Sequence, residues 1–163
     1  MSARTADLCD AHGEDLQVVQ PGFLDYGARR SFSGPMATVR APGDNSLVRA
    51  ALEEPGGGRV LVVDGEASMR CALLGDRLAA LAARNGWHGV VVNGCVRDAD
   101  ELGRTEVGVK ALATTPRKSV KEGRGERDVP LTFGGATFRP GEYLYADADG
   151  IVLATTALPA LQS

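Results

Sequence analysis

The chain has 163 residues, of which 44% are hydrophobic and 24% are charged, and its formal net charge at pH 7 is −3. This composition predicts one globular domain over residues 1–163, and the acidic balance argues against a protein dedicated to binding nucleic acid. No stretch approaches the ~20 apolar residues of a membrane span, and the N-terminus lacks the apolar segment of a secretory signal. We therefore expect a soluble, cytoplasmic protein.

In the first two thirds of the chain, the hydrophobic pattern predicts helices that alternate with strands. Thr5 is the expected N-cap of the first helix, and Asp44 or Asn45 is the expected N-cap of the second. The predicted helices cover residues 6–12, 46–54 and 76–85, with one helical turn at 98–102, and the predicted strands cover residues 16–19, 36–40, 59–63, 89–93 and 109–114.

The C-terminal third has a different pattern. The basic segment 116–128 predicts a solvated surface loop, and residues 128–135, 136–147 and 150–156 predict short strands joined by Gly and Pro turns. Asp147 and Asp149 are acidic candidates for a site, although the ADADG sequence around them favours a β-turn. The order of elements predicts an α/β or α+β fold with a β-rich C-terminal third.

Cysteine and histidine, which often carry catalysis or bind metals, are few. Cys9, Cys71 and Cys95 have neither the number nor the spacing of a disulfide framework or a zinc site, so we expect free thiols in a reducing compartment. Of the two histidines, His12 and His88, the second stands at a predicted strand start, where a structural role is favoured. The sequence contains no evident nucleophilic triad.

Two aspartates stand at predicted helix starts, and each has an ordinary explanation. Asp76 lies in the first turn of a helix, where an acid is stabilised by the helix dipole and the free N–H groups. Asp98 and Glu101 form a D-x-x-E pattern, in which Asp98 would cap the helical turn and Glu101 would reach back to it. Taken alone, the local sequence favours these structural roles.

The spacing of the two aspartates suggests a second interpretation. A helix that starts at Asp76 runs about 15 Å away, and the next strand returns over about 20 Å or more. We therefore expect Gly75–Asp76 and Arg97–Asp98 to meet at one end of the sheet, where ligands commonly bind. The helix N–H groups and Arg97 could bind a carboxylate, and Asp76, Asp98 and Glu101 offer oxygen ligands suited to Mg²⁺ or Mn²⁺.

Gly75-Asp76, twenty residues, Arg97-Asp98, two residues and Glu101 match the pattern G-D-x20-R-D-x2-E/D. This motif resembles that of class II pyruvate aldolases of the 4-hydroxy-4-methyl-2-oxoglutarate aldolase type. Over roughly residues 4–155 the chain is similar to the regulator of ribonuclease activity A family, in segments such as VLVVDGEASMRCALLGD, VGVKALATTPRKS and VPLTFGGATFRPGEYLYADADGIVL.

The resemblance implies a fold, an assembly and a cofactor. The fold would be an α/β layered sandwich related to the swivelling phosphohistidine domains. The chain would form a homotrimer or a dimer of trimers, with sites at the subunit borders. The cofactor would be a divalent metal, Mg²⁺ or Mn²⁺. Some larger aldolases take a further acidic group from a C-terminal extension of the neighbouring subunit, and we assign no counterpart in this chain.

The resemblance also implies roles for single residues. Asp98 would bind the metal directly, and Asp76 would hold it through water, a role that the spacing also allows for Glu101. Arg97 and Asp76 would be catalytic. The substrate-binding residues would be Gly75, Asp76, Arg77, Leu78 and Arg97, the first four through the backbone.

The sequence leaves two functional hypotheses open. The first is a metal-dependent lyase that cleaves 4-hydroxy-4-methyl-2-oxoglutarate into two pyruvates and also decarboxylates oxaloacetate, since both reactions pass through a pyruvate enolate. The second is a non-catalytic ring that binds and inhibits an RNA-degrading endonuclease of the ribonuclease E type. The presence of both aspartates favours the enzyme. A methyltransferase or nucleotide binder is disfavoured because Gly56–Gly58 precede a predicted strand instead of following it.

Overall fold

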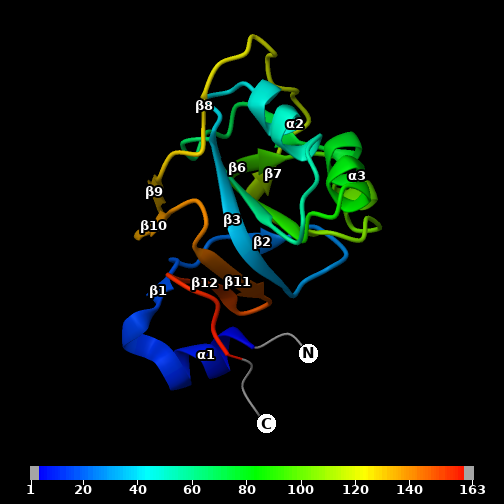
Figure 1. The fold of residues 1–163 in the computed structure, drawn as a ribbon. Coiled ribbons are helices and arrows are strands. Elements are labelled where there is room, and N and C mark those ends of the chain that lie inside the picture. The colour runs from blue at the N-terminus through cyan, green and yellow to red at the C-terminus, as the bar shows by residue number, and fades with distance from the viewer. Residues whose placement is uncertain (1–3, 160–163) are drawn as a thin grey trace.

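The computed structural model describes residues 4–159, which are built around one curved sheet (Figure 1). The helical elements are α1 (Thr5–His12), the short 3-10 turn η1 (Gly13–Asp15), α2 (Ser46–Leu52), α3 (Asp76–Arg84) and α4 (Ala99–Leu102). The strands are β1 (Gln17–Val18), β2 (Leu24–Asp25), β3 (Phe32–Arg40), β4 (Val60–Asp64), β5 (Ala72–Leu74), β6 (Gly89–Val96), β7 (Gly108–Thr114), β8 (Glu126–Arg127), β9 (Leu131–Phe133), β10 (Ala136–Phe138), β11 (Tyr143–Asp147) and β12 (Gly150–Ala154).

The long strand β3 joins two halves of the sheet. Its first residues pair antiparallel with β11, and the residues from Met36 onward pair parallel with β4. Beyond β4 the parallel order continues with β6 and β7, and β5 runs parallel along the end of β6. Beyond β11 the antiparallel order continues with β12 and β1. The parallel half thus brings the carboxyl ends of β5, β6 and β7 to one edge.

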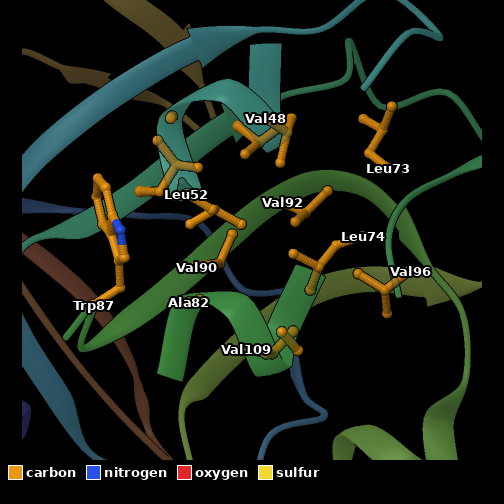
Figure 2. Packing of buried hydrophobic residues seen from close by; sticks show 14 of the residues in the cluster. Val48, Leu52, Leu73, Leu74, Ala82, Trp87, Val90, Val92, Val96 and Val109 are labelled. Carbon is orange, nitrogen blue, oxygen red and sulfur yellow. The ribbon is translucent and has the colours of Figure 1, made fainter. Parts of the chain in front are cut away.

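Helices α2 and α3 supply the crossover connections that parallel strands require, and both lie on the same face of the parallel half (Figure 1). This face holds the larger hydrophobic core. Val48 and Leu52 of α2, Ala82 of α3, and Val90 and Val92 of β6 face one another there (Figure 2). The helical spacing of the apolar residues therefore reflects packing against a sheet.

The opposite face of the sheet holds a second core, which explains why β4 is buried along its whole length. Leu61 and Val63 point into the helix-side core, whereas Val60 and Val62 point into the second core. The second core is closed by strands of the C-terminal third, with Phe138 among its fully buried side chains. A strand buried on both faces has the continuous apolar sequence seen in β4.

The predicted helical segments and the α/β class with a β-rich C-terminal third are confirmed. The strand predicted at 36–40 begins at Phe32 instead, because Gly34 and Pro35 interrupt its apolar pattern. Three short strands, β2, β5 and β8, were not predicted, since two or three residues carry too little alternation. The pairing of β8 with β3 also shows that the segment 116–128 is only partly a free loop.

The prediction that Thr5 caps α1 is wrong in detail. Thr5 is the first helical residue, and its N–H and hydroxyl both donate to the carboxylate of Asp147, at 2.8 and 2.6 Å. The same carboxylate accepts the N–H of Asp149 at 3.0 Å within the expected turn. Asp147 is therefore a structural residue that fastens α1 to the β11–β12 hairpin.

The structure also bears on the expectations of free thiols and of a structural role for His88. Cys9, Cys71 and Cys95 are free thiols. The Nδ1 atom of His88 lies 2.8 Å from the carbonyl oxygen of Ser33, which fits a structural role. Among residues 4–159, no helix is long and apolar enough to cross a membrane.

Candidate active site

The two dipeptides singled out in the sequence follow adjacent parallel strands. Gly75–Asp76 follows β5, and Arg97–Asp98 follows β6. The two chain segments are held together beyond the last strand pair by a hydrogen bond from the N–H of Arg97 to the carbonyl oxygen of Leu74, at 3.0 Å. Helix α3 starts at Asp76, so its N-terminal N–H groups face this edge of the sheet.

The carboxylate of Asp98 caps α3 and not its own helical turn. Its Oδ2 atom accepts the N–H of Asp76 at 2.9 Å, and it makes no side-chain cap on α4. The predicted D-x-x-E capping box is therefore wrong. The physical reason is the backbone of Asp98, whose φ of 61° and ψ of 47° are left-handed and direct the side chain towards α3. A non-glycine residue in this conformation is uncommon and strained, and such residues gather at functional sites.

Gly75 is required by the closeness of this contact. A Cβ atom at position 75 would lie 2.6 Å from Oδ2 of Asp98 and 3.4 Å from Cγ of Arg97. The backbone of Gly75 is extended, so the requirement comes from space and not from an unusual φ. Any larger residue would push the Asp98 carboxylate off the start of α3.

A cavity of about 560 Å³ lies over this junction. It brings together the predicted residues Gly75, Asp76, Arg77, Leu78, Arg97 and Asp98, but Glu101 is exposed on α4 and does not line it. The sequence did not predict the rest of the lining. These further residues are Asn45, Ser46, Arg49, Ala72, Leu74, Lys118, Ser119 and Lys121.

The charges around the cavity are mostly positive. Among the described residues, only two acidic side chains, Asp76 and Asp98, line it. The basic side chains that line it are those of Arg49, Arg77, Arg97, Lys118 and Lys121. A cavity lined by an excess of one charge concentrates ligands of the opposite charge. The site therefore favours an anionic ligand of small-molecule size.

The lysines reach the cavity because the segment after β7 folds back along the same edge. The N–H of Ala72 donates to the carbonyl oxygen of Arg117 at 2.8 Å, and the N–H of Val120 donates to Gly43 at 3.1 Å. The segment 117–121 thus lies between β5 and the residues before α2. The sequence did carry one hint of this placement. The basic segment follows β7, whose carboxyl end lies at the same edge of the sheet as those of β5 and β6.

Asp44 anchors this segment. Its fully buried carboxylate accepts hydrogen bonds from the N–H and hydroxyl of Ser46, and from the N–H groups of Glu122 and Arg124, at 2.6 to 3.2 Å. Burial alone would raise the pKa of Asp44, but these hydrogen bonds outweigh it and lower the pKa to about 2. Of the two predicted caps of α2, Asn45 occupies the N-cap position without a side-chain capping bond, and the carboxylate of Asp44, one residue earlier, accepts the N–H of Ser46.

The donor chemistry at the junction fits a hard divalent cation. Oδ2 of Asp98 is held by the N–H of Asp76, which fixes the orientation of the carboxylate and leaves Oδ1 as an oxygen ligand. Residues 4–159 contain no cluster of three or more His, Cys, Asp or Glu side chains suited to a metal. Mg²⁺ is commonly held by one or two carboxylates and keeps several waters, so Asp98 with Asp76 nearby suits it.

Comparison with known proteins agrees with the fold. The family model "Aldolase/RraA" matches residues 5–153. A protein of Alkalilimnicola ehrlichii, provisionally named a 4-hydroxy-4-methyl-2-oxoglutarate aldolase, is 60% identical over 97% of this chain and 98% of its own length. A protein of Burkholderia multivorans with the same provisional name is 58% identical over 97% of this chain and 99% of its own length.

Two solved structures have nearly the same fold. The RNA-processing inhibitor RraA from Thermus thermophilis superposes with a TM-score of 0.94 at 48% identity, covering 100% of this chain and 99% of that one. A Geobacillus kaustophilus protein described as an S-adenosylmethionine:2-dimethylmenaquinone methyltransferase has a TM-score of 0.95 at 53% identity, covering 99% and 100%. The fold is an α/β sandwich in which Asp76, Arg97 and Asp98 meet at one edge of the sheet. The chain belongs to the Aldolase/RraA family.

Proposed function

We propose that the protein is a divalent-metal-dependent aldolase that cleaves 4-hydroxy-4-methyl-2-oxoglutarate into two molecules of pyruvate. The observation that carries the proposal is the meeting of Asp76, Arg97 and Asp98 at the start of α3, in the wall of a positively charged cavity. The names of the Alkalilimnicola and Burkholderia relatives support the same activity. The methyltransferase description of the Geobacillus structure finds no support in the local fold, since β4 is followed by a turn and β5, not by a phosphate-binding loop and helix.

The start of α3 provides the binding site for the carboxylate of the pyruvate half. Ala79 donates the first intrahelical hydrogen bond, to Gly75 at 3.0 Å, so the N–H groups of Arg77 and Leu78 precede the helical ladder. Such N–H groups and the positive end of the helix dipole bind carboxylates. Arg97 adds a guanidinium on the neighbouring segment, where it can contact the 2-oxo oxygen.

In the reaction, the bond between C3 and C4 breaks and its electron pair moves to the C2 carbonyl, which becomes an enolate. The 4-hydroxyl loses its proton and becomes the carbonyl of the second pyruvate, while the enolate takes a proton at C3. Arg97 stabilises the negative charge on the enolate oxygen, and the Asp76 carboxylate moves the proton through solvent. A Mg²⁺ or Mn²⁺ ion held by Asp98 would supply Lewis-acid polarisation of the 2-oxo group.

Decarboxylation of oxaloacetate is expected as a second activity. Loss of CO₂ from C4 leaves its electron pair on the same pyruvate enolate, so the same groups stabilise the product. The reaction differs from the aldol cleavage because no hydroxyl has to lose a proton. A comparison of the two substrates therefore separates two properties of the site. Both substrates require stabilisation of the pyruvate enolate, but only the aldol substrate requires recognition of the half that leaves as the second pyruvate.

The proposal includes an assembly and a second candidate function. We expect a homotrimer or a dimer of trimers in the cytoplasm, in which subunit contacts would cover exposed apolar side chains such as Val18 and Leu24, which are 58% and 56% exposed.

The likeness to the Thermus RNA-processing inhibitor supports the alternative that the protein inhibits a ribonuclease E type endonuclease by direct binding and without contact to nucleic acid. Co-purification with such a ribonuclease, and its inhibition by the purified protein, test this alternative.

Activity measurements with and without metal test the enzyme proposal. We expect pyruvate release from both substrates with Mg²⁺ or Mn²⁺, loss of activity in EDTA, and a fall of about 100-fold or more for Asp98→Ala. Asp10→Ala is the matched control, because Asp10 is an exposed acid on α1, far from the cavity lining. Absence of activity on both substrates, or activity that EDTA and Asp98→Ala leave intact, would overturn the proposal.

A further inference from the structure

The loop that connects β4 to β5 is bound to the end of β6 by backbone and side-chain contacts. The N–H groups of Gly65 and Ala67 both donate to the carbonyl oxygen of Asn93, at 3.0 and 3.1 Å. Two residues further along β6, the thiol of Cys95 donates to the Sδ atom of Met69 at 3.3 Å. The position of Met69 is therefore coupled to the strand that leads into the candidate active site.

The backbone of this loop is strained, and its surroundings hold it in place. Glu66 and Ala67 have φ values of 57° and 59°, in the left-handed region that non-glycine residues rarely adopt. The carboxylate of Asp64 accepts the N–H of Glu66 at 2.8 Å and the side-chain amide of Asn93 at 2.9 Å. Strained residues persist only where neighbouring contacts fix them, so these hydrogen bonds keep Met69 against β6.

The two sulfur atoms of this contact differ in their access to an oxidant. Met69 is 53% exposed, and a thioether reacts with peroxides without losing a proton. Cys95 is 1% exposed, and burial raises the pKa of its thiol, so the thiolate that peroxides attack is scarce. Within residues 4–159 the other methionine is Met36, which is 2% exposed. Met69 is therefore the sulfur of this pair that an oxidant reaches first.

We propose that Met69 is a site of reversible oxidation, at which a peroxide converts the thioether to a sulfoxide and the change reaches the candidate active site through Cys95. One oxygen atom of the peroxide binds to Sδ, the O–O bond breaks, the sulfur loses two electrons, and the peroxide is reduced to water or an alcohol. The sulfoxide oxygen is a polar acceptor in place of a weak one for the S–H group of Cys95. Because the two sulfur atoms lie only 3.3 Å apart, an oxygen atom between them forces the side chains to separate.

The end of β6 is suited to carry this displacement to the site. The register of β6 shifts beside Cys95 on both sides, with β5 just after the pair with Ala72 and with β7 just before Cys95. The strand is therefore held less regularly here than in its first half. Arg97 and Asp98 follow within three residues, and Oδ2 of Asp98 accepts the N–H of Asp76 at 2.9 Å. A displacement of Cys95 thus disturbs the contact that joins β6 to α3.

Peptide mapping by mass spectrometry tests the modification site. The protein is treated with hydrogen peroxide and then with dithiothreitol, which reverses sulfenic acids and disulfides of cysteine but leaves methionine sulfoxide. Met69 is expected to gain one oxygen atom about tenfold faster or more than the buried Met36, which is the internal control, and to lose it again with a methionine sulfoxide reductase. Equal rates at the two methionines, or no oxidation of Met69, would overturn the proposal.

Hydrogen–deuterium exchange tests the coupling to β6 without any need for turnover. In the peptide that contains residues 93–98, exchange in the wild type is expected to become about tenfold faster or more after oxidation, and to return to its starting rate after treatment with the reductase. Met69→Leu is the matched control, because it keeps an apolar side chain of similar size without the sulfur, and its exchange is expected not to respond. Unchanged exchange in the oxidised wild type, or an equal response in Met69→Leu, would refute the coupling.

The effect on activity is the one part of the inference that rests on the proposed function. Oxidised wild type is expected to release pyruvate from oxaloacetate about tenfold more slowly or worse with Mg²⁺, and the same treatment is expected to leave Met69→Leu at its starting rate. Full activity with Met69 completely oxidised would refute the effect on the site. A wild type without turnover before oxidation would refute the proposed function instead, and the mapping and exchange measurements would still decide the inference.

Discussion

Replacing Asp44 by Asn tests how the segment 117–121, which carries the two cavity lysines, is held in place. The carboxylate accepts four hydrogen bonds, two from Ser46 and one each from the N–H groups of Glu122 and Arg124, and it is fully buried. An asparagine at this position keeps the size of the side chain. It removes the charge, however, and turns an NH₂ group towards donors that need an acceptor. We expect the segment that carries Lys118 and Ser119 to lose part of its support.

The magnitude follows from the pKa of Asp44. Its depression from 3.8 to about 2 corresponds to roughly 2 kcal/mol of stability in the charged form. Because the folded-state pKa lies below the unfolded value, this stability is fully present above about pH 5 and is lost as the pH falls towards 2. At about pH 3 roughly half of it remains. The neutral side chain of Asp44→Asn has no such pH dependence.

Urea unfolding of the wild type and Asp44→Asn at several pH values between 7 and 3 measures this difference. We expect the wild type to be more stable by about 2 kcal/mol at pH 7 and by about half as much at pH 3. Asp10→Asn, at an exposed acid on α1, is the control for general effects of charge. A stability difference that stays constant over this range would refute the assignment of the effect to the Asp44 carboxylate.

Two further substitutions test close contacts in the fold and the site. Gly75→Ala should lower activity about 100-fold with little change in Tm, because its Cβ would displace the Asp98 carboxylate; Gly13→Ala, where a Cβ meets nothing within 4 Å, is the control. Asp147→Asn should lower the free energy of unfolding by about 1 kcal/mol, measured by urea titration, because it weakens the contact with Thr5 that fastens α1. An active Gly75→Ala enzyme, or an unchanged stability for Asp147→Asn, would contradict these contacts.

The parts of the fold that the sequence predicts well are those governed by local periodicity. The apolar face of α3 results from packing on one face, and the continuous apolar run of β4 results from burial on both faces. Each kind of packing leaves a recognisable pattern in the chain. The meeting of Gly75 with Asp98 could also be predicted, because the lengths of one helix and one strand bring the chain back to its starting edge. Element length and direction were sufficient for that inference.

The cap made by Asp98 could not be predicted in the same way. Its D-x-x-E sequence is typical of a helix start, and only the left-handed backbone at Asp98 turns the carboxylate away from α4. That conformation depends on how β6 ends beside β5, a strand of three residues with too little sequence pattern to detect. The outcome was decided by a contact between segments that are distant in the chain.

The segment 117–121 in the cavity wall could be predicted even less. Its position also explains why the net charge of the chain is a poor guide to its ligand. Lys118 and Lys121 lie in a basic, glycine-bearing segment whose sequence is typical of a solvated loop. Their place in the cavity depends on Asp44, more than seventy residues earlier, because its carboxylate binds the backbone that follows them. The whole chain carries a charge of −3, yet the cavity is lined by five basic and two acidic side chains. The attraction of an anionic substrate therefore arises from which charges the fold gathers at one edge of the sheet, and not from their sum over the chain.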